Sequence, residues 1–287
     1  MYLKILMWFF AFLSIEAVFC QDLSAYYPSV EGELIRHTYY HLDYNEAHEQ
    51  PNWVIYFADP VGNQTRIDRF KPDPDISSGS ATLDDYKGSG YDRGHLCPAA
   101  DMKRNVQSMT ESFFMSNMSP QAPSFNRGIW KNLEALIRNW SLANDKDLVV
   151  TGGILTETCG SIGHGVTVPC SYYKIYVDLE KMKGIGFVLK NEASSEPIQS
   201  FAVSIDEIEE LTGIDFFAQL DDAQQTQIEG SFELDSFAWN SATMTRQNLA
   251  APAKEQTGVQ CQGITSAGKR CSRIIGASES YCWQHEK

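Results

Sequence analysis

The chain has 287 residues, of which 43% are hydrophobic and 21% are charged. This composition excludes a disordered, collagen-like or polytopic membrane protein. The 23 basic and 37 acidic residues give a formal net charge of −14, which argues against binding of nucleic acid through bulk positive charge. Any site for phosphate groups must therefore be local.

The first 20 residues have the pattern of a signal peptide. Lys4 supplies a positive charge, residues 5–13 form an apolar run, and the small Cys20 precedes the expected cleavage site. The run is too short for an ordinary membrane anchor, so we expect no stable membrane insertion and a mature chain that is periplasmic or secreted. A lipid-anchored Cys20 is the alternative, which the bulky Phe19 disfavours.

The next elements are an arm, a strand and a long loop. Residues 21–50 carry few apolar repeats and predict an irregular N-terminal arm. The aromatic and β-branched residues 52–58 predict the first strand. Residues 59–92 are rich in turn formers and predict an exposed loop, and loops of this length in a compact domain are usually functional.

A helix, three strands and a second helix are expected next. A helix is expected from Pro123, with Ser124 as its cap and an apolar stripe that ends at Trp140. A short acidic helix is expected between Ser204 and Gly213. Three β-rich runs predict strands of an antiparallel sheet: residues 148–153, 172–178 and 184–189.

Export to an oxidising compartment permits disulfide bonds. Cys159 and Cys170 enclose a glycine-rich loop between two strand-like segments, and we predict that they pair. Two free thiols are the alternative, because spacing does not show that the bond geometry is met.

The segment Asp92-Arg93-Gly94-His95 places a carboxylate, a cation and a base at one point of the chain. An arginine offers a planar fork for two phosphate oxygens. A neutral histidine near its ordinary pKa can take a proton from water, and the glycine is expected to let the backbone bend. A surface turn with a solvated histidine would contain the same residues.

Together with two later segments, residues 116–121 and 125–134, this motif resembles the DNA/RNA non-specific endonuclease family, of the ββα-metal or His-Me finger type. With weaker similarity elsewhere, the resemblance covers roughly residues 30–235. It implies an α+β fold in which helices flank a central antiparallel sheet with a ββα-metal active-site motif. The endonuclease domain would span residues 21–240.

The resemblance also implies site roles. His95 would be the general base, and Asn126 the single protein ligand of a catalytic Mg²⁺, with Mn²⁺ as an alternative. Glu134 would hold a water ligand of the ion, and Arg138 would neutralise charge on the phosphate. Arg93 would bind a phosphate oxygen or support the active-site turn. On one regular helix, Asn126, Glu134 and Arg138 would line one edge, because each step of four residues drifts by only about 40° around the helix.

Other polar residues have weaker assignments. The family places an arginine in the upstream loop, for which Arg66 and Arg69 are the candidates. Asn117 is kept with them as a candidate substrate-binding residue, although we expect it to fix a loop. His37 and His41 are spaced four apart, but no acidic third ligand follows at a familiar spacing, so we expect both to be structural.

Residues 241–258 have the composition of a linker, and residues 259–287 form a cysteine-rich module. Cys261, Cys271, Cys282 and His285 provide the ligand count of a closed structural zinc site. A small appendage stapled by disulfides is the alternative.

The sequence therefore predicts an exported, Mg²⁺-dependent, sequence-nonspecific endonuclease that hydrolyses DNA, RNA or both and leaves 5′-phosphates. The alternative is a catalytically inactive nucleic-acid or surface binding protein on a nuclease scaffold. His95, Asn126, Glu134 and Arg138 argue against the alternative, because a scaffold without chemistry need not retain all four. Formation of a homodimer is left open.

Overall fold

The computed structural model describes residues 22–142, 147–230 and 232–239, together with Gln262 and two short strands. These are β12 (Gly258–Gln260) and β13 (Ile274–Gly276), which pair antiparallel. The chain divides into two compact units, residues 1–245 and 246–287. The predicted signal peptide, linker residues 241–257 and all four predicted zinc ligands lie outside the described residues.

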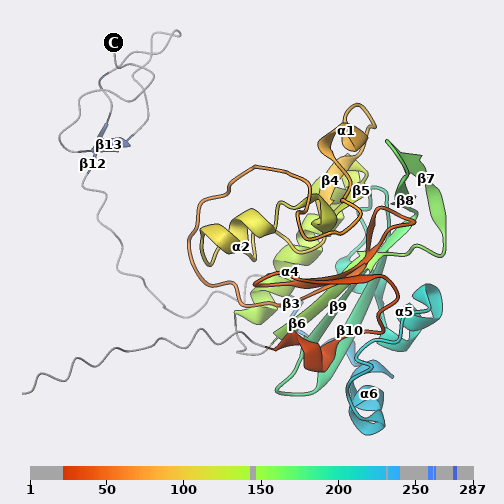
Figure 1. Ribbon diagram of the computed structural model, residues 1–287. Helices are drawn as coiled ribbons and strands as arrows, with labels where there is room; N and C mark the ends of the chain where they lie inside the picture. Colours follow the sequence, from red (N-terminus) through yellow and green to blue (C-terminus); the bar gives the residue numbers. More distant parts are fainter. Residues whose placement is uncertain are drawn as a thin grey trace, which may run out of the picture. The chain divides into compact units, whose positions relative to one another are not determined.

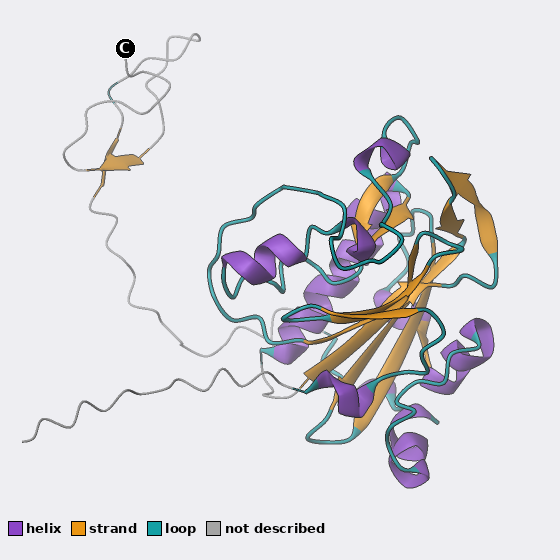
Figure 2. Cartoon of the chain, viewed as in Figure 1, coloured by secondary structure: helices purple, strands orange, loops and turns teal. Residues whose placement is uncertain are grey.

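A seven-stranded antiparallel sheet forms the centre of the first unit (Figures 1 and 2). In spatial order its strands are β1 (Glu33–Arg36), β2 (His41–Asn45), β3 (Gln50–Phe57), β6 (Asp147–Gly153), β9 (Ser171–Asp178), β10 (Lys183–Lys190) and β11 (Ala202–Val203). The predicted α+β fold with a central antiparallel sheet is confirmed.

Both faces of the sheet are buried, because successive side chains of a strand point to opposite sides. In β3, Val54 and Tyr56 join one core cluster, whereas Trp53 and Ile55 join the other. Helix α4 (Lys131–Ser141) covers the first face. The second face is covered by η1 (Leu23–Tyr26), α5 (Ile205–Thr212) and α6 (Asp222–Glu229), as Figure 1 shows for α5 and α6.

A smaller strand pair lies on the α4 side of the sheet. Strands β4 (Asp92–His95) and β5 (Met118–Gln121) pair antiparallel, with His95 opposite Met118. The chain then enters α3 (Pro123–Phe125), the π-helical segment η3 (Asn126–Trp130) and α4. The remaining elements are α1 (Leu83–Tyr86), α2 (Val106–Glu111), η2 (Met115–Asn117), β7 (Thr158–Ile162), β8 (Val166–Pro169), η4 (Ile198–Phe201) and η5 (Leu234–Ser236).

The predictions for the N-terminal arm and for the helix cap are wrong. Residues 21–50 are not an irregular arm, because they contain β1 and β2. Asp43 is fully buried in β2 and accepts backbone hydrogen bonds from Glu31 and Gly32, so the strand lacks the apolar alternation of an ordinary half-buried strand. Ser124 does not cap the helix either, because Pro123 already occupies its first position.

Other predictions are confirmed. The strands expected at 148–153, 172–178 and 184–189 correspond to β6, β9 and β10, each with slightly wider bounds. Helix α5 begins after Ser204, whose side chain accepts a hydrogen bond from the backbone N–H of Glu207, and ends at the left-handed Gly213.

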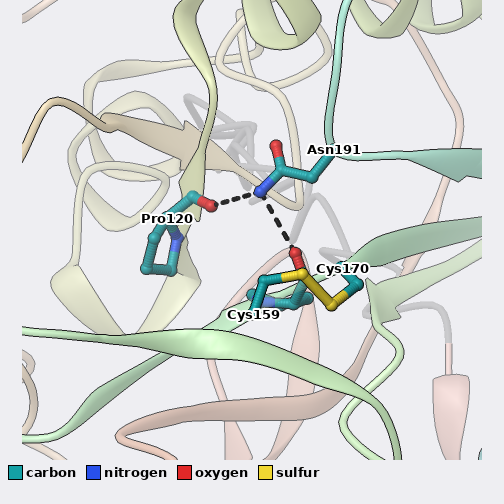
Figure 3. The surroundings of a disulfide bond; sticks show 5 residues. Pro120, Cys159, Cys170 and Asn191 are labelled. Atoms are coloured by element: carbon teal, nitrogen blue, oxygen red, sulfur yellow. Dashed lines mark hydrogen bonds between the residues drawn. A yellow bond between two sulfur atoms is a disulfide. The ribbon is translucent and has the colours of Figure 1, made fainter.

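The predicted disulfide between Cys159 and Cys170 is present and closes the hairpin of β7 and β8 (Figure 3). The Asn191 side chain next to it donates hydrogen bonds to the carbonyl oxygens of Pro120 and Pro169, over 3.0 and 3.1 Å. Because Pro120 belongs to β5, the disulfide-bonded hairpin is joined to the strand that pairs with β4.

Candidate active site

His95 lies at the end of β4 between two aromatic rings. The ring centroids of Phe70 and Phe113 are 5.7 and 4.8 Å from that of His95. Its Nε2 atom is shut off from solvent and has no hydrogen-bond partner in the structure. Desolvation, followed by the positive charge of Arg66, lowers the pKa of His95 to about 3. The expected ordinary pKa is therefore not met, whereas the expected neutral form is, and the alternative of a solvated histidine on a surface turn does not fit a half-buried residue in a strand.

Two arginines stack on the same aromatic rings. The Cζ atom of Arg93 lies 4.1 Å from the ring centroid of Phe70, and that of Arg66 lies 4.9 Å from the centroid of Phe113. Arg66 is half-exposed and also pairs with Asp68 over 2.7 Å. Of the two predicted upstream arginines, Arg66 is the one that contacts a ring beside His95. Arg69 is exposed on the same loop.

Gly94 is required by close packing rather than by a bend. It lies within the extended strand β4 and has no positive φ. A Cβ atom at this position would lie 2.2 Å from the side chain of Gln121, which is fully buried. The predicted role of Gly94 in bending the backbone is therefore wrong.

The half-buried Asn126 is held by Asp92. Its Nδ2 donates to Asp92 Oδ2 over 2.9 Å, and Arg127 Nε donates to the same oxygen over 2.8 Å. Burial would raise the pKa of Asp92, but the hydrogen bonds from Arg127 and Asn126 outweigh it and lower that pKa. Because Nδ2 is engaged, Oδ1 is the atom of Asn126 that could bind a cation.

The helix that carries the predicted site is not regular. Asn126 begins the π-helical segment, in which Gly128 has the non-helical angles φ −106° and ψ −115°. The expected alignment of Asn126, Glu134 and Arg138 along one regular helix is therefore wrong, since only the last two belong to α4. Short π-helical segments are frequent at functional sites.

Arg138 is oriented by a buried carboxylate. Its Nε donates a hydrogen bond to Asp101 Oδ1, and the hydroxyl of Tyr56 donates to Asp101 Oδ2 over 3.3 Å. Burial raises the pKa of Asp101, and the charge of Arg138 opposes this shift. Arg138 keeps 24% of its side chain exposed, so its guanidinium retains access to solvent.

Lys174 is a fully buried cation at this site. It lies in β9, with Nζ 3.4 Å from the carbonyl oxygen of Leu96 and 4.8 Å from the ring centroid of Trp130. Burial lowers the pKa of Lys174, whereas the charges of Glu134 and Asp101 counteract this. Burial likewise raises the pKa of Glu134 to about 7, with Lys174 as the main opposing charge. Two acidic and two basic side chains therefore lie together at this site. We call them the charge cluster: Asp101, Glu134, Arg138 and Lys174.

Sequence reasoning did not assign a role to Lys174 or Asp101. A lysine within the otherwise apolar and aromatic run of residues 172–177 is a signal that could have indicated Lys174. Phe70 and Phe113 gave no such signal, because aromatic residues are common in any core.

Asn117 does not fit a direct contact with substrate. It is fully buried, its Oδ1 accepts from Cys97 N over 2.8 Å, and its Nδ2 donates to the carbonyl oxygens of Cys97 and Ser112. The alternative expectation, that Asn117 fixes a loop, agrees with these bonds.

His37 and His41 are both buried and hydrogen-bonded. His37 Nε2 lies 2.8 Å from Asp73 Oδ2, and His41 Nδ1 lies 2.5 Å from the hydroxyl of Tyr27. Ligand atoms of His37, Asp73 and Asp75 lie within 4.8 Å of one another and could hold a metal ion. Asp73 is already engaged by His37 and the Ser116 hydroxyl, which agrees with a structural role for His37.

Comparisons with known proteins identify the family of the chain. The model of the DNA/RNA non-specific endonuclease family matches residues 24–223. The chain is 35% identical over 210 residues to a nuclease of Nostoc sp., covering 68% of this chain and 76% of that protein. It is 33% identical over 218 residues to nuclease C1 of Cunninghamella echinulata, covering 68% of this chain and 86% of that protein.

A human relative and a solved structure extend the comparison. The mitochondrial nuclease EXOG of Homo sapiens is 33% identical over 68% of this chain and 60% of its own length. A chain from the crystal structure of the EndoG/EndoGI complex superposes with a TM-score of 0.64 at 28% identity, covering 71% of this chain and 93% of that chain. Among the described residues, no helix is long and apolar enough to cross a membrane.

Proposed function

Because the chain belongs to the DNA/RNA non-specific endonuclease family, we propose that His95, Asn126, Glu134 and Arg138 carry out its hydrolysis of phosphodiester bonds. The observation that carries this proposal is the hydrogen bond from Asn126 to Asp92. It connects the start of the helical segment to β4, the strand that ends at the neutral base His95. This bond supports the proposal, because it would hold a cation-binding oxygen and a proton acceptor on neighbouring elements.

His95 would act as the general base. Since Nε2 is shut off from solvent, we assign the proton transfer to Nδ1. Nδ1 takes a proton from a water molecule, the water oxygen bonds to phosphorus, and the bond between phosphorus and the 3′-oxygen breaks. The 3′-oxygen takes a proton from solvent, which leaves a 3′-hydroxyl and a 5′-phosphate.

The arginines would bind and orient the phosphate groups. Arg66 and Arg93 lie on the rings beside His95, and their guanidinium groups match the geometry of phosphate oxygens. Arg138 is held by Asp101 and would neutralise the negative charge that develops on phosphorus. This local positive charge would bind substrate despite the net charge of −14.

The residues present fit a hard divalent cation, and we propose Mg²⁺, with Mn²⁺ as the alternative. The Oδ1 of Asn126 would hold the ion, and Glu134 would orient its hydration water. Burial leaves Glu134 with a pKa of about 7, so a nearby cation would favour the charged carboxylate. When bound, the ion would supply positive charge that stabilises the phosphate in the transition state.

Digestion of plasmid DNA and of RNA, each with and without EDTA, tests the function. We expect cleavage of nucleic acid that stops in EDTA and returns with excess Mg²⁺, and 5′-phosphate ends that accept label from polynucleotide kinase only after phosphatase treatment. Digestion by the purified protein that continues in EDTA would contradict the metal requirement. The His95→Ala variant, purified in the same way, is the control for contaminating nucleases.

We also propose export after removal of residues 1–20 and a zinc-binding tail at residues 259–287. The apolar run at residues 5–13 supports the first and the three cysteines with His285 support the second. N-terminal sequencing of protein recovered outside the cytoplasm tests export. Elemental analysis tests the tail, and disulfides through Cys261, Cys271 or Cys282 without retained zinc would contradict it.

A further inference from the structure

Helices α5 and α6 pack on β10, on the sheet face opposite α4 (Figure 1). Two glycines of β10 permit this close approach. A Cβ atom on Gly184 would lie 2.5 Å from the carbonyl oxygen of Ile228, and one on Gly186 would lie 2.5 Å from Ile208 Cδ1. The end of α6 is therefore held against the strand and beside α5.

Three carboxylates meet where these helices contact each other. Asp206 and Glu209 are three residues apart and share one side of α5, and Glu229 is the last residue of α6. One oxygen of each carboxylate lies within 4.8 Å of the others. We call these three residues the carboxylate cluster. Asp206 is exposed and Glu209 is half-buried, so the cluster remains open to water on one side.

Glu229 is the member of the cluster that needs a partner. Glu229 is only 7% exposed. Its Oε1 atom is shut off from solvent and makes no hydrogen bond in the structure. A helix C-terminus carries partial negative charge, which is unfavourable for a carboxylate. A buried acceptor without a partner costs free energy, and the position at the helix end adds to that cost.

No protein cation compensates for this charge within the described part of the chain. The sequence has no lysine or arginine between Lys190 and Arg246. The ion pairs of the described residues involve none of the three carboxylates. Glu209 accepts one hydrogen bond, from the backbone N–H of Phe216 over 2.7 Å, which leaves its other oxygen available.

We propose that Asp206, Glu209 and Glu229 bind a divalent cation of the Ca²⁺ class, which links α5 to α6. Ca²⁺ takes six to eight oxygen ligands in flexible geometry and accepts carboxylates together with water. Three carboxylates on two helices, open to water on one side, provide such a set. The site is structural, and the seven-stranded sheet separates it from His95 and α4. Glu229 also lies beyond residue 223, where the match to the family model ends.

Thermal unfolding of the full mature chain at constant Mg²⁺, with either EGTA or about 1 mM Ca²⁺, tests the proposal. EGTA removes Ca²⁺ while leaving Mg²⁺ for the active site. We expect Ca²⁺ to raise the unfolding midpoint by about 5 °C or more when its free concentration exceeds Kd a hundredfold. Calorimetric titration with Ca²⁺ should show one site per chain.

Variants locate the site. Glu229→Gln and Asp206→Asn should each lose the Ca²⁺-dependent shift and the calorimetric site, whereas Glu210→Gln, which removes the same charge from an exposed position of α5, should retain both. Nuclease activity in Mg²⁺ should stay within about twofold in all three. A wild-type midpoint that does not respond to Ca²⁺ would overturn the proposal and indicate that a proton neutralises Glu229. An equal response of wild type and Glu229→Gln would also overturn it, by placing the ion elsewhere.

Discussion

The side-chain amide of Asn126 donates a hydrogen bond over 2.9 Å to the carboxylate of Asp92. Asp92 is the first residue of β4 and pairs with Gln121 of β5, whereas Asn126 begins the π-helical segment. The bond therefore sets the direction of the Asn126 amide relative to the strand that carries His95. If Asn126 binds the cation as proposed, Asp92 would act on the site through Asn126.

Substitutions of this pair should differ in severity. Asn126→Ala should lower the cleavage rate at least 100-fold and recover in part with excess Mg²⁺, because substrate phosphate can still bind the ion. Asp92→Ala should cost about 10- to 100-fold, the range found for residues that orient a metal ligand. Rates of plasmid cleavage at several Mg²⁺ concentrations measure both.

The exposed Asn132 of α4 offers a control, and Asn132→Ala should leave the rate unchanged. If Asp92→Ala lowered the cleavage rate more than Asn126→Ala, the proposed assignment of Asn126 as the ligand and Asp92 as its supporting residue would be contradicted.

His95→Ala should lower the cleavage rate by 10²- to 10⁴-fold, the usual contribution of a general base. Affinity for nucleic acid should change little, because Arg66 and Arg93 remain on their rings. Cleavage assays and binding measured in EDTA separate the two effects. His164→Ala is the matched control, since that side chain is 90% exposed and lies on the β7–β8 hairpin. Activity of His95→Ala within a few-fold of wild type would exclude it as the base.

Lys174→Met should destabilise the protein by about 3 kcal/mol, because it leaves a buried carboxylate of the charge cluster without compensation. Adding Glu134→Gln should recover much of that stability, since the cluster is then balanced again by Asp101 and Arg138. The cleavage rate should not recover with stability, because Glu134 is proposed to orient the hydration water of the cation. Urea unfolding of both single variants and the double variant gives the coupling energy. Strictly additive losses would show that Lys174 and Glu134 act independently.

Stability without Ca²⁺ should fall as the pH rises, in part because of Glu229. Burial, and then the charges of Glu209 and Asp206, raise the pKa of Glu229 from 4.5 to about 8. The folded state therefore binds a proton that the unfolded state releases between these values, and the associated stability is present below pH 4.5 and lost as the pH passes 8.

Glu229→Gln cannot ionise, so in EGTA it should unfold at least about 2 °C above wild type at pH 8 and close to wild type at pH 4.5. Melting curves across this range measure the difference, and Glu210→Gln again serves as the control. If the unfolding midpoints of Glu229→Gln and wild type differed by the same amount at every pH, titration of Glu229 would not contribute to the pH dependence of stability.

Local signals in the sequence were sufficient for much of the architecture. Apolar and β-branched runs placed β6, β9 and β10, because strands buried on both faces need continuous apolar residues. Ser204 and Gly213 marked the ends of α5, because capping depends only on neighbouring backbone groups. Cys159 and Cys170 on either side of a glycine-rich turn indicated a disulfide bond, and the structure showed that the geometry for the bond is met.

The sequence showed the residue types of the candidate site, but it did not show which side chains surround them. The motif from Asp92 to His95 and the residues Asn126, Glu134 and Arg138 indicated the chemistry before any contact was known. Only the tertiary structure showed that Phe70 and Phe113 enclose His95, and so lower its pKa.

The roles of Gly94 and Lys174 also depend on surroundings that the sequence does not show. Gly94 is needed because Gln121 of the paired strand fills the space that a Cβ atom would take. The charges of Glu134 and Asp101 counteract the effect of burial on the pKa of Lys174. The sequence alone determined the elements, their ends and the chemical groups, since these depend on neighbours within a few residues. Desolvation, close packing and charge balance were decided by the tertiary structure, because each depends on residues that only the fold brings together.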